Sequence, residues 1–167
     1  YDEIAYLTEE GIIGGYPDGT FRPNDSLTRA QAVTMIARAL EWDTSIKRTN
    51  FSDVSSDYYA AGAISYASSH EIINGFPDGT FRPNQSITRA QMSAILGNAF
   101  SLGTSNTGPF RDVNRNTTGY EEINQLYRLA IVYGYDNNTR FQPNYPLTRV
   151  QFAIILSRLL NEDLRLF

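Results

Sequence analysis

The sequence contains no cysteine and a single histidine, His70. Without cysteine the chain can form neither disulfides nor thiolate metal sites, and it has no thiol nucleophile. One histidine leaves one candidate base for a Ser-His-Asp triad and excludes a multi-histidine metal site. We therefore expect no metal and no other cofactor, and we do not expect an enzyme.

Long apolar runs and an excess of basic charge are missing as well. The apolar runs are too short for a lipid-spanning helix, so we expect no membrane insertion. The 167 residues include 14 Lys and Arg against 18 Asp and Glu, a formal net charge of −4. A general nucleic-acid binder needs a basic face to collect phosphates, so this balance argues against nucleic acid as a partner.

What the sequence does contain is an internal repeat. Residues 12–31 read IIGGYPDGTFRPNDSLTRAQ, and residues 72–91 read IINGFPDGTFRPNQSITRAQ, with 16 identities in 20 positions. A more diverged copy, IVYGYDNNTRFQPNYPLTRVQ, occupies residues 131–151. The segment Phe-Ser-Asp-Val at 51–54 matches Phe-Arg-Asp-Val at 110–113. These matches predict three repeats, 1–50, 51–109 and 110–167. The first lacks its opening Phe-x-Asp-Val, which would begin about ten residues before Tyr1 by the same offset.

Each repeat is expected to fold as helix, turn, helix. The first helix has an apolar stripe, exemplified by Ile4, Leu7 and Ile12 in the first copy. We expect it to close at a glycine with positive φ, as a helix C-cap; these are Gly15, Gly75 and Gly134. A tight Pro-Asp-Gly-Thr turn follows, containing Asp18 and Asp78, and the next phenylalanine is expected to plug the core.

The second helix of each repeat has a clear start. Thr followed three residues later by Gln is a capping box, and it occurs at Thr28, Thr88 and Thr148. Apolar residues then follow at helical spacing, as in Ala32, Met35 and Ile36, so one face is buried. A unit of this size buries a modest core alone. We therefore expect an all-α protein in which three helix-turn-helix units pack around a pseudo-threefold axis and share helices.

Three arginines, Arg29, Arg89 and Arg149, occupy an unfavourable place at the first position of these helices. The helix dipole disfavours a cation there by roughly 0.3–1 kcal/mol, so each guanidinium needs a negative partner. One candidate is internal, a structural salt bridge to Asp18, Asp53, Asp78 or Asp112. The other is an external carboxylate or phosphate, bound by the guanidinium and by free N–H groups at the helix N-terminus. The residues alone leave both open.

Tyrosine is the most frequent aromatic residue, with 11 in the chain. A flat apolar ring with a hydroxyl suits stacking on sugars, and it suits half-buried packing equally well. Seven tyrosines are expected near the first helices and turns: Tyr58, Tyr59, Tyr66, Tyr120, Tyr127, Tyr133 and Tyr135. The glutamate pairs at 9–10 and 121–122 are expected on the solvent face of helices, so they do not indicate the paired carboxylates of a glycosidase.

The order Phe-x-Asp-Val, helix, Gly-Tyr-Pro-Asp-Gly-Thr-Phe-Arg-Pro-Asn, Thr-Arg-Ala-Gln resembles the S-layer homology (SLH) domain. Three tandem copies resemble the usual SLH triplet, and the resemblance covers essentially the whole chain. It implies a three-pronged spindle with ligand grooves between neighbouring repeats. It also implies an extracellular module that anchors surface-layer proteins and exoenzymes to the bacterial cell wall. The implied ligand is a secondary cell-wall polysaccharide, often with a pyruvate ketal on N-acetylmannosamine.

The resemblance also implies binding residues. The family's Thr-Arg-Ala-Glu motif falls on residues 28–31, 88–91 and 148–151, with Gln31, Gln91 and Gln151 where the family often has glutamate. Its ligand-associated glycine falls on Gly15, Gly75 and Gly134, and its early tryptophan on Tyr59 and Thr118. The third copy replaces Pro-Asp-Gly-Thr with residues 136–139, Asp-Asn-Asn-Thr, so we expect the third groove to bind most weakly.

Residues and resemblance together predict a cell-wall anchoring module. The expected glycan-binding residues are Arg29, Arg89, Arg149, Gln31, Gln91, Gln151, Gly15, Gly75, Gly134, Asp18, Asp78 and Tyr59. The arginines are expected to pair with the ketal carboxylate, and we expect the isolated module to be a monomer. The alternative is a structural or protein–protein interaction module whose arginines form internal salt bridges.

Overall fold

The computed structural model describes residues 2–165, and this range folds into six α-helices without a β-strand. In chain order the helices are α1 (Asp2–Glu9), α2 (Arg29–Ala39), α3 (Ala61–Ser69), α4 (Arg89–Ala99), α5 (Tyr120–Arg128) and α6 (Arg149–Leu160). A short 3₁₀-helix, η1 (Glu162–Leu164), follows α6. The expected all-α class is confirmed.

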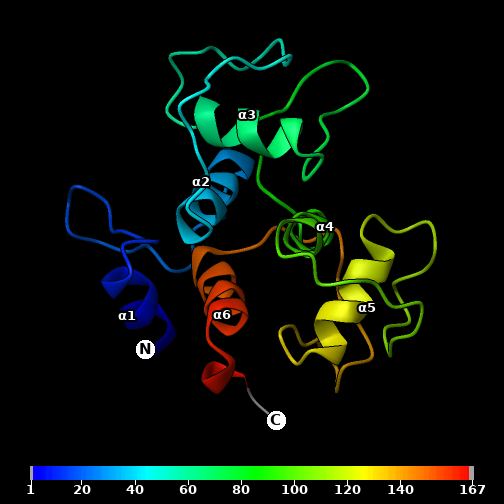
Figure 1. The fold of residues 1–167 in the computed structure, drawn as a ribbon. Helices are drawn as coiled ribbons and strands as arrows, with labels where there is room; N and C mark the ends of the chain where they lie inside the picture. Colours follow the sequence, from blue (N-terminus) through cyan, green and yellow to red (C-terminus); the bar gives the residue numbers. More distant parts are fainter. Residues whose placement is uncertain (1, 166–167) are drawn as a thin grey trace.

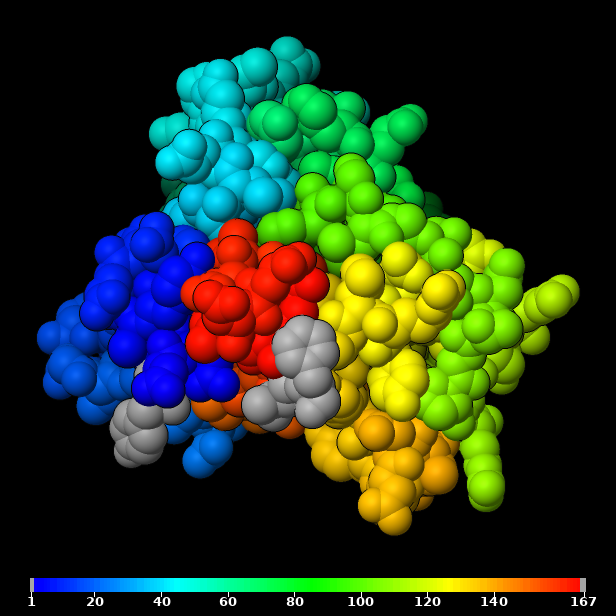
Figure 2. Space-filling model, turned by 60° about the horizontal axis from the view of Figure 1, so that its bottom comes forward, coloured from blue at the N-terminus to red at the C-terminus, as the bar shows by residue number. Residues whose placement is uncertain are grey.

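The six helices pack as three pairs that form three prongs (Figure 1). We name α2–α3 the first prong, α4–α5 the second and α6–α1 the third. In each prong the second helix of one repeat packs against the first helix of the next, and α6 closes the circle by packing on α1. Figure 2 shows α1 and α6, in blue and red, packed side by side. The repeats therefore share helices, as the sequence predicts.

A ring of three main-chain hydrogen bonds joins the prongs at the centre. The N–H of Leu27 donates to the carbonyl of Leu147 (2.8 Å), Ile87 donates to Leu27 (2.9 Å), and Leu147 donates to Ile87 (2.9 Å). All three side chains are fully buried. Each bond joins two repeats, so the ring confirms the pseudo-threefold arrangement.

The second helices begin where the capping boxes predict. In each, the N-cap threonine hydroxyl accepts a hydrogen bond from the main-chain N–H of the glutamine three residues later, and the glutamine Oε1 accepts one from the main-chain N–H of the threonine. The expected apolar face is buried, with Ala32, Met35 and Ile36 between 0 and 6% exposed. Local sequence therefore fixes both the start and the buried face of α2, α4 and α6.

The first helices end earlier than predicted. They stop at Glu9, Ser69 and Arg128, each six residues before the expected glycine. The chain leaves the helix through positive φ at Gly11 (70°), Glu71 (57°) and Ala130 (58°), so the left-handed residue that ends the helix is a glycine only once. The prediction of C-caps at Gly15, Gly75 and Gly134 is wrong, because these glycines follow the helix and have no positive φ.

Close packing, rather than a positive φ, explains why glycine is required at two of these positions. A Cβ on Gly75 would lie 2.6 Å from the carbonyl oxygen of Thr80 and would collide with the ring of Phe51. Gly134 has the same relation to Phe110. Phe51 also packs on the fully buried Phe81, with ring centroids 5.4 Å apart. The opening phenylalanine of the repeat therefore needs a glycine opposite its ring.

The aspartate of the same Phe-x-Asp-Val element holds the turn that follows. The Asp53 carboxylate accepts the N–H of Phe81 and the N–H of Arg82, both at 2.8 Å. Arg82 has φ of 58°, a left-handed conformation that costs a non-glycine residue roughly 1–2 kcal/mol. Asp112 does the same for Phe141 and Gln142. Two charge-assisted hydrogen bonds thus stabilise a strained corner.

The Pro-Asp-Gly-Thr turns have the expected conformation. Gly19 and Gly79 have φ of 79° and 82°. Asp18 accepts hydrogen bonds from the main-chain N–H (3.0 Å) and hydroxyl (2.6 Å) of Thr20, as Asp78 does from Thr80. Of the three expected plugs, Phe81 and Phe141 are fully buried and Phe21 is half-buried.

Candidate functional site: three arginine-lined grooves

Three grooves on the surface are built to one plan. Each is lined by the chain that follows a first helix, by one face of the second helix of the same repeat, and by an arginine from the neighbouring repeat. We name each after this arginine. The Arg149 groove lies on α2 (≈ 240 Å³), the Arg29 groove on α4 (≈ 300 Å³) and the Arg89 groove on α6 (≈ 190 Å³). Every groove therefore depends on contact between repeats.

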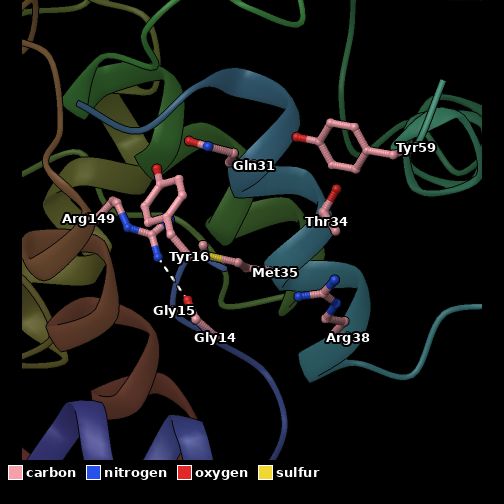
Figure 3. A pocket seen from close by; sticks show the side chains of 9 residues that line it. All are labelled: Gly14, Gly15, Tyr16, Gln31, Thr34, Met35, Arg38, Tyr59 and Arg149. Atoms are coloured by element: carbon pink, nitrogen blue, oxygen red, sulfur yellow. Dashed lines mark hydrogen bonds between the residues drawn. The ribbon is translucent and has the colours of Figure 1, made fainter. Parts of the chain in front are cut away.

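The Arg149 groove shows how the parts meet (Figure 3). Its guanidinium reaches across from α6 and donates to the carbonyl of Gly14 (3.0 Å), while its Nε donates to the carbonyl of Phe21 (2.9 Å). Tyr59, from the second repeat, points its ring toward α2 on the other side. The remaining lining comes from Gly15 and Tyr16 and from Gln31, Thr34, Met35 and Arg38 of α2.

The three arginines are almost completely buried, with 4–5% of their surface exposed. In each, Nε donates to a phenylalanine carbonyl in another repeat; the acceptors are Phe81 for Arg29, Phe141 for Arg89 and Phe21 for Arg149. Each guanidinium also lies 4.4–4.8 Å from the ring centre of the same phenylalanine, within the range of a cation–π contact. Carbonyls and aromatic faces thus hold the charge in place.

No carboxylate among residues 2–165 forms an ion pair with these arginines. Asp18 and Asp78 pair instead with Arg22 (2.7 Å) and Arg82 (3.2 Å) in exposed turns. The carboxylates of Asp53 and Asp112 are engaged by the main-chain N–H groups described above. Of the two partners that the sequence left open for these arginines, the internal salt bridge is therefore not formed among the described residues.

The expectation of free N–H groups at the helix N-terminus is also wrong. In α2 the N–H of Arg29 donates to the carbonyl of Gln85 (2.9 Å), that of Ala30 to Pro83 (3.0 Å) and that of Gln31 to the Thr28 hydroxyl (3.1 Å). Corresponding bonds cap α4 and α6. Carbonyls of the neighbouring repeat already accept hydrogen bonds from these main-chain N–H groups, so only the guanidinium can attract an anion.

Burial perturbs the pKa of two of the arginines, Arg29 and Arg89. Loss of solvent lowers the pKa of Arg29 to about 10, the charge of Arg82 adds to this effect, and Asp53 opposes it. Burial also lowers the pKa of Arg89, against the opposing influence of Tyr135 and Asp112. A lowered pKa of a cation means that its surroundings do not fully compensate the charge. An anion in the groove would supply that compensation.

The structure brings most of the predicted binding residues to the grooves. Gln31, Gln91 and Gln151 each line one groove while completing a capping box. Gly15 and Gly75 line the Arg149 and Arg29 grooves, whereas in the Arg89 groove Tyr133 lines the wall in place of Gly134. Asp18 and Asp78 lie outside all three linings.

The sequence interpretation missed a position on the second helix. Arg38, Asn98 and Arg158 line the three grooves and lie seven residues after the capping glutamine, two turns along the same face. Arg158 is 9% exposed, and its Nε is buried without a hydrogen-bond partner. The spacing from glutamine was the signal that could have identified these residues.

Residues 2–165 contain neither a metal-binding group of His, Asp or Glu side chains nor a helix long and apolar enough to cross a membrane. The grooves therefore offer guanidinium, amide, hydroxyl and aromatic groups. This set can bind an acidic, hydroxyl-rich ligand.

Comparison with known proteins gives a consistent family. Cell surface glycoprotein 1 of Acetivibrio thermocellus is 33% identical over 162 residues, which are 87% of this chain and 7% of that protein. The surface-layer 125 kDa protein of Lysinibacillus sphaericus is 32% identical over 94% of this chain and 14% of its own length. The cellulosome-anchoring protein of A. thermocellus is 36% identical over 72% of this chain and 28% of its own length. The chain thus spans less than a third of each of these relatives.

The family model of the S-layer homology domain matches residues 1–33, 50–93 and 109–153. Its three matches cover each of the three Thr-Arg-x-Gln motifs. With these matches, the relatives and the three-pronged fold, the chain belongs to the S-layer homology domain family, whose members are non-catalytic modules of the extracellular bacterial cell surface.

Proposed function

We propose that this chain anchors a surface protein non-covalently to the bacterial cell wall by binding acidic sugars of a wall polysaccharide in its grooves. One observation carries the proposal: each groove holds a buried guanidinium that pairs with no carboxylate among residues 2–165. Buried charges in proteins are normally paired. Three recurrences of an unpaired one support an anion from outside the chain.

A carboxylate on a sugar fits these grooves. The fork of an arginine matches the two oxygens of a carboxylate, and Gln31 and Thr34 beside Arg149 offer hydrogen bonds to hydroxyls. Tyr59, with 63% of its surface exposed, offers a face for stacking on the sugar ring. We propose a pyruvylated N-acetylmannosamine as this sugar, since its ketal places a carboxylate on a hexosamine.

Three grooves on one module favour retention on a polymer. A single sugar binds weakly, but once one groove is occupied the next sugar of the same chain is present at a high effective concentration. The overall charge of −4 does not prevent this, because the local field in a groove governs such contacts. The name of the cellulosome-anchoring relative is consistent with such a role.

A purely structural or protein–protein module is the second candidate. One observation favours it: each arginine already joins two repeats through hydrogen bonds to main-chain carbonyls, such as Arg29 to Phe81. In that case the arginines would serve assembly of the prongs without any ligand. Wall binding by the folded chain separates the two candidates.

The deciding experiment is calorimetric titration of the chain with purified wall polysaccharide, before and after chemical removal of pyruvate. Binding that disappears with the pyruvate supports carboxylate recognition. Equal binding before and after removal would still support the glycan as the ligand, but it would refute the role of the carboxylate. A folded sample that binds neither form would favour the structural module.

A further inference from the structure

A second hollow adjoins the Arg149 groove on the first prong. Its volume is ≈ 390 Å³, and the walls that it does not share with the groove are formed by Ala37, Glu41, Trp42, Thr44, Lys47, Gly62 and Ala63. It shares three side chains with the groove, namely Thr34, Arg38 and Tyr59. The shared side chains place the hollow directly beside the groove along α2.

The walls of the hollow are held in place. The Ser65 hydroxyl of α3 donates to the carbonyl of Arg48 (2.9 Å), which fixes the segment that carries Lys47. The carbonyl of Thr44 packs so closely on Gly62 that a Cβ at that position would collide with it. The hollow is therefore preformed, and a ligand would meet little cost of ordering.

The chemistry of the hollow suits a sugar ring. Trp42, the only tryptophan of the chain, is half-buried, and its ring stacks on that of Tyr66 with the ring centroids 4.8 Å apart. Tyr59 and Lys47 are exposed at the rim. Aromatic rings flanked by polar donors are the usual lining of a site for a ligand with an apolar face and many hydroxyls.

The second prong fills the corresponding place. The offset of 59 residues that aligns Phe51 with Phe110 aligns Ala63 with Glu122, and the offset of 60 aligns Ala37 with Gly97. Glu122 lies against Gly97, with its Cγ 2.6 Å from where a Cβ of that glycine would be. In the third prong the residue aligned with Ala63 is Glu3. The Glu122 side chain therefore occupies space that Ala63 leaves open in the first prong.

We propose that the hollow is a second sugar subsite, which holds the residue next to the acidic sugar bound in the Arg149 groove. The inference rests on the proposed function, because it takes that groove to bind the acidic sugar. The first prong then recognises the polysaccharide over more than one residue. The second prong, with Glu122 in this place, recognises the acidic sugar alone.

The test uses size-fractionated oligosaccharides of one, two and four residues, each bearing the acidic sugar, prepared from purified wall polysaccharide. Calorimetry measures binding, and Trp42 fluorescence reports on the hollow directly. We expect the longer fragments to bind about tenfold more tightly than the single sugar, the order of one aromatic contact. We also expect them alone to protect Trp42 from acrylamide quenching.

Two variants make the test specific. Lys47→Ala removes an exposed donor, and Trp42→Leu installs the residue that the second prong carries at position 102. Both should abolish the gain with length and leave the affinity for the single sugar unchanged. Arg38→Ala, which alters a shared side chain, should weaken both.

Each outcome has a defined meaning. If all fragments bind with equal affinity while acrylamide still quenches Trp42, the second subsite is refuted and the proposal that the Arg149 groove binds the acidic sugar is retained. The same holds if Lys47→Ala and Trp42→Leu keep the full gain with length. If no fragment binds to the folded chain, the proposed function itself fails, and the subsite with it.

Discussion

Replacement of Arg29 by glutamine separates a ligand-binding charge from a structural one. The pKa of Arg29, lowered to about 10 by burial, corresponds to about 3 kcal/mol of destabilisation by the charge at neutral pH. The hydrogen bond from Nε to Phe81 opposes this with about 1.5–3 kcal/mol, as expected for a charged donor. The two effects nearly cancel, so Arg29→Gln should change the free energy of unfolding by about 1 kcal/mol or less.

Binding should respond quite differently. Loss of the guanidinium removes the charged partner of the carboxylate, which costs about 2–5 kcal/mol at that groove, or more than about 30-fold in affinity. Calorimetry with a monovalent acidic sugar should therefore show one binding site fewer per chain. Arg22→Gln is the matched control, because it removes an equal charge from an exposed turn outside the grooves.

One result would refute the reasoning behind this prediction. A buried ion pair loses about 3–5 kcal/mol when one partner is removed. If urea titration of Arg29→Gln showed a loss of that size, the charge would have an internal partner. If the number of sites stayed the same in a stable variant, Arg29 would have no part in binding.

Three further predictions concern packing, the strained corner and pH. Gly75→Ala should lower the free energy of unfolding, measured with urea, by about 1–3 kcal/mol, because the new methyl group overpacks against Phe51. Gly15→Ala should lower it by less than about 1 kcal/mol, because the Cβ there would meet only the carbonyl of Thr20, at 3.0 Å. Equal losses in the two variants would contradict this explanation. Asp53→Asn should lower the free energy of unfolding by about 1.5–3 kcal/mol, because the single oxygen of the amide cannot replace both carboxylate oxygens that accept the N–H groups of Phe81 and Arg82. An unchanged melting profile would show that the carboxylate is dispensable. Affinity at the Arg29 groove should be level from pH 7 to 9 and fall as the pH passes about 10, because the guanidinium loses its proton there. In Arg29→Gln, calorimetry should find no binding at this groove at any of these pH values, and an affinity of the unchanged chain that is undiminished at pH 11 would refute the lowered pKa.

Local signals in the sequence predicted much of this fold. The capping boxes at Thr28, Thr88 and Thr148 placed the starts of α2, α4 and α6, since the bonds that cap a helix join residues three apart. The recurrence of whole units predicted a shared, threefold arrangement. Both kinds of information lie within one repeat and its copies.

Contacts between repeats were not predictable in the same way. One of the two partners left open by the sequence was an anion bound at the main-chain N–H of Arg29, because an isolated helix leaves its first donors unpaired. In the folded chain Gln85 and Pro83 supply carbonyls to those donors from 50 or more residues away. No local pattern indicates such a partner, so the sequence could place the arginines at the helix start but could not show that the main-chain donors there are already bonded.

The glycines after the first helices also depend on contacts that are distant in the sequence. A glycine after a helix suggests a left-handed C-cap, yet Gly75 is required by the ring of Phe51, which precedes it by 24 residues. The joint recurrence of Phe51 with Gly75 and Phe110 with Gly134 was visible in the sequence. Its meaning depended on a packing contact that only the three-dimensional structure reveals.

The closure of the third prong has a mechanical consequence. Its two helices come from opposite ends of the described chain, α1 from the first residues and α6 from the last (Figure 1). A force applied between the two ends would load the contact between α1 and α6 directly and bypass the other prongs. That contact would shear before α2–α3 and α4–α5 bore any tension. A module pulled in this way should lengthen in two steps, with the first and second prongs yielding last.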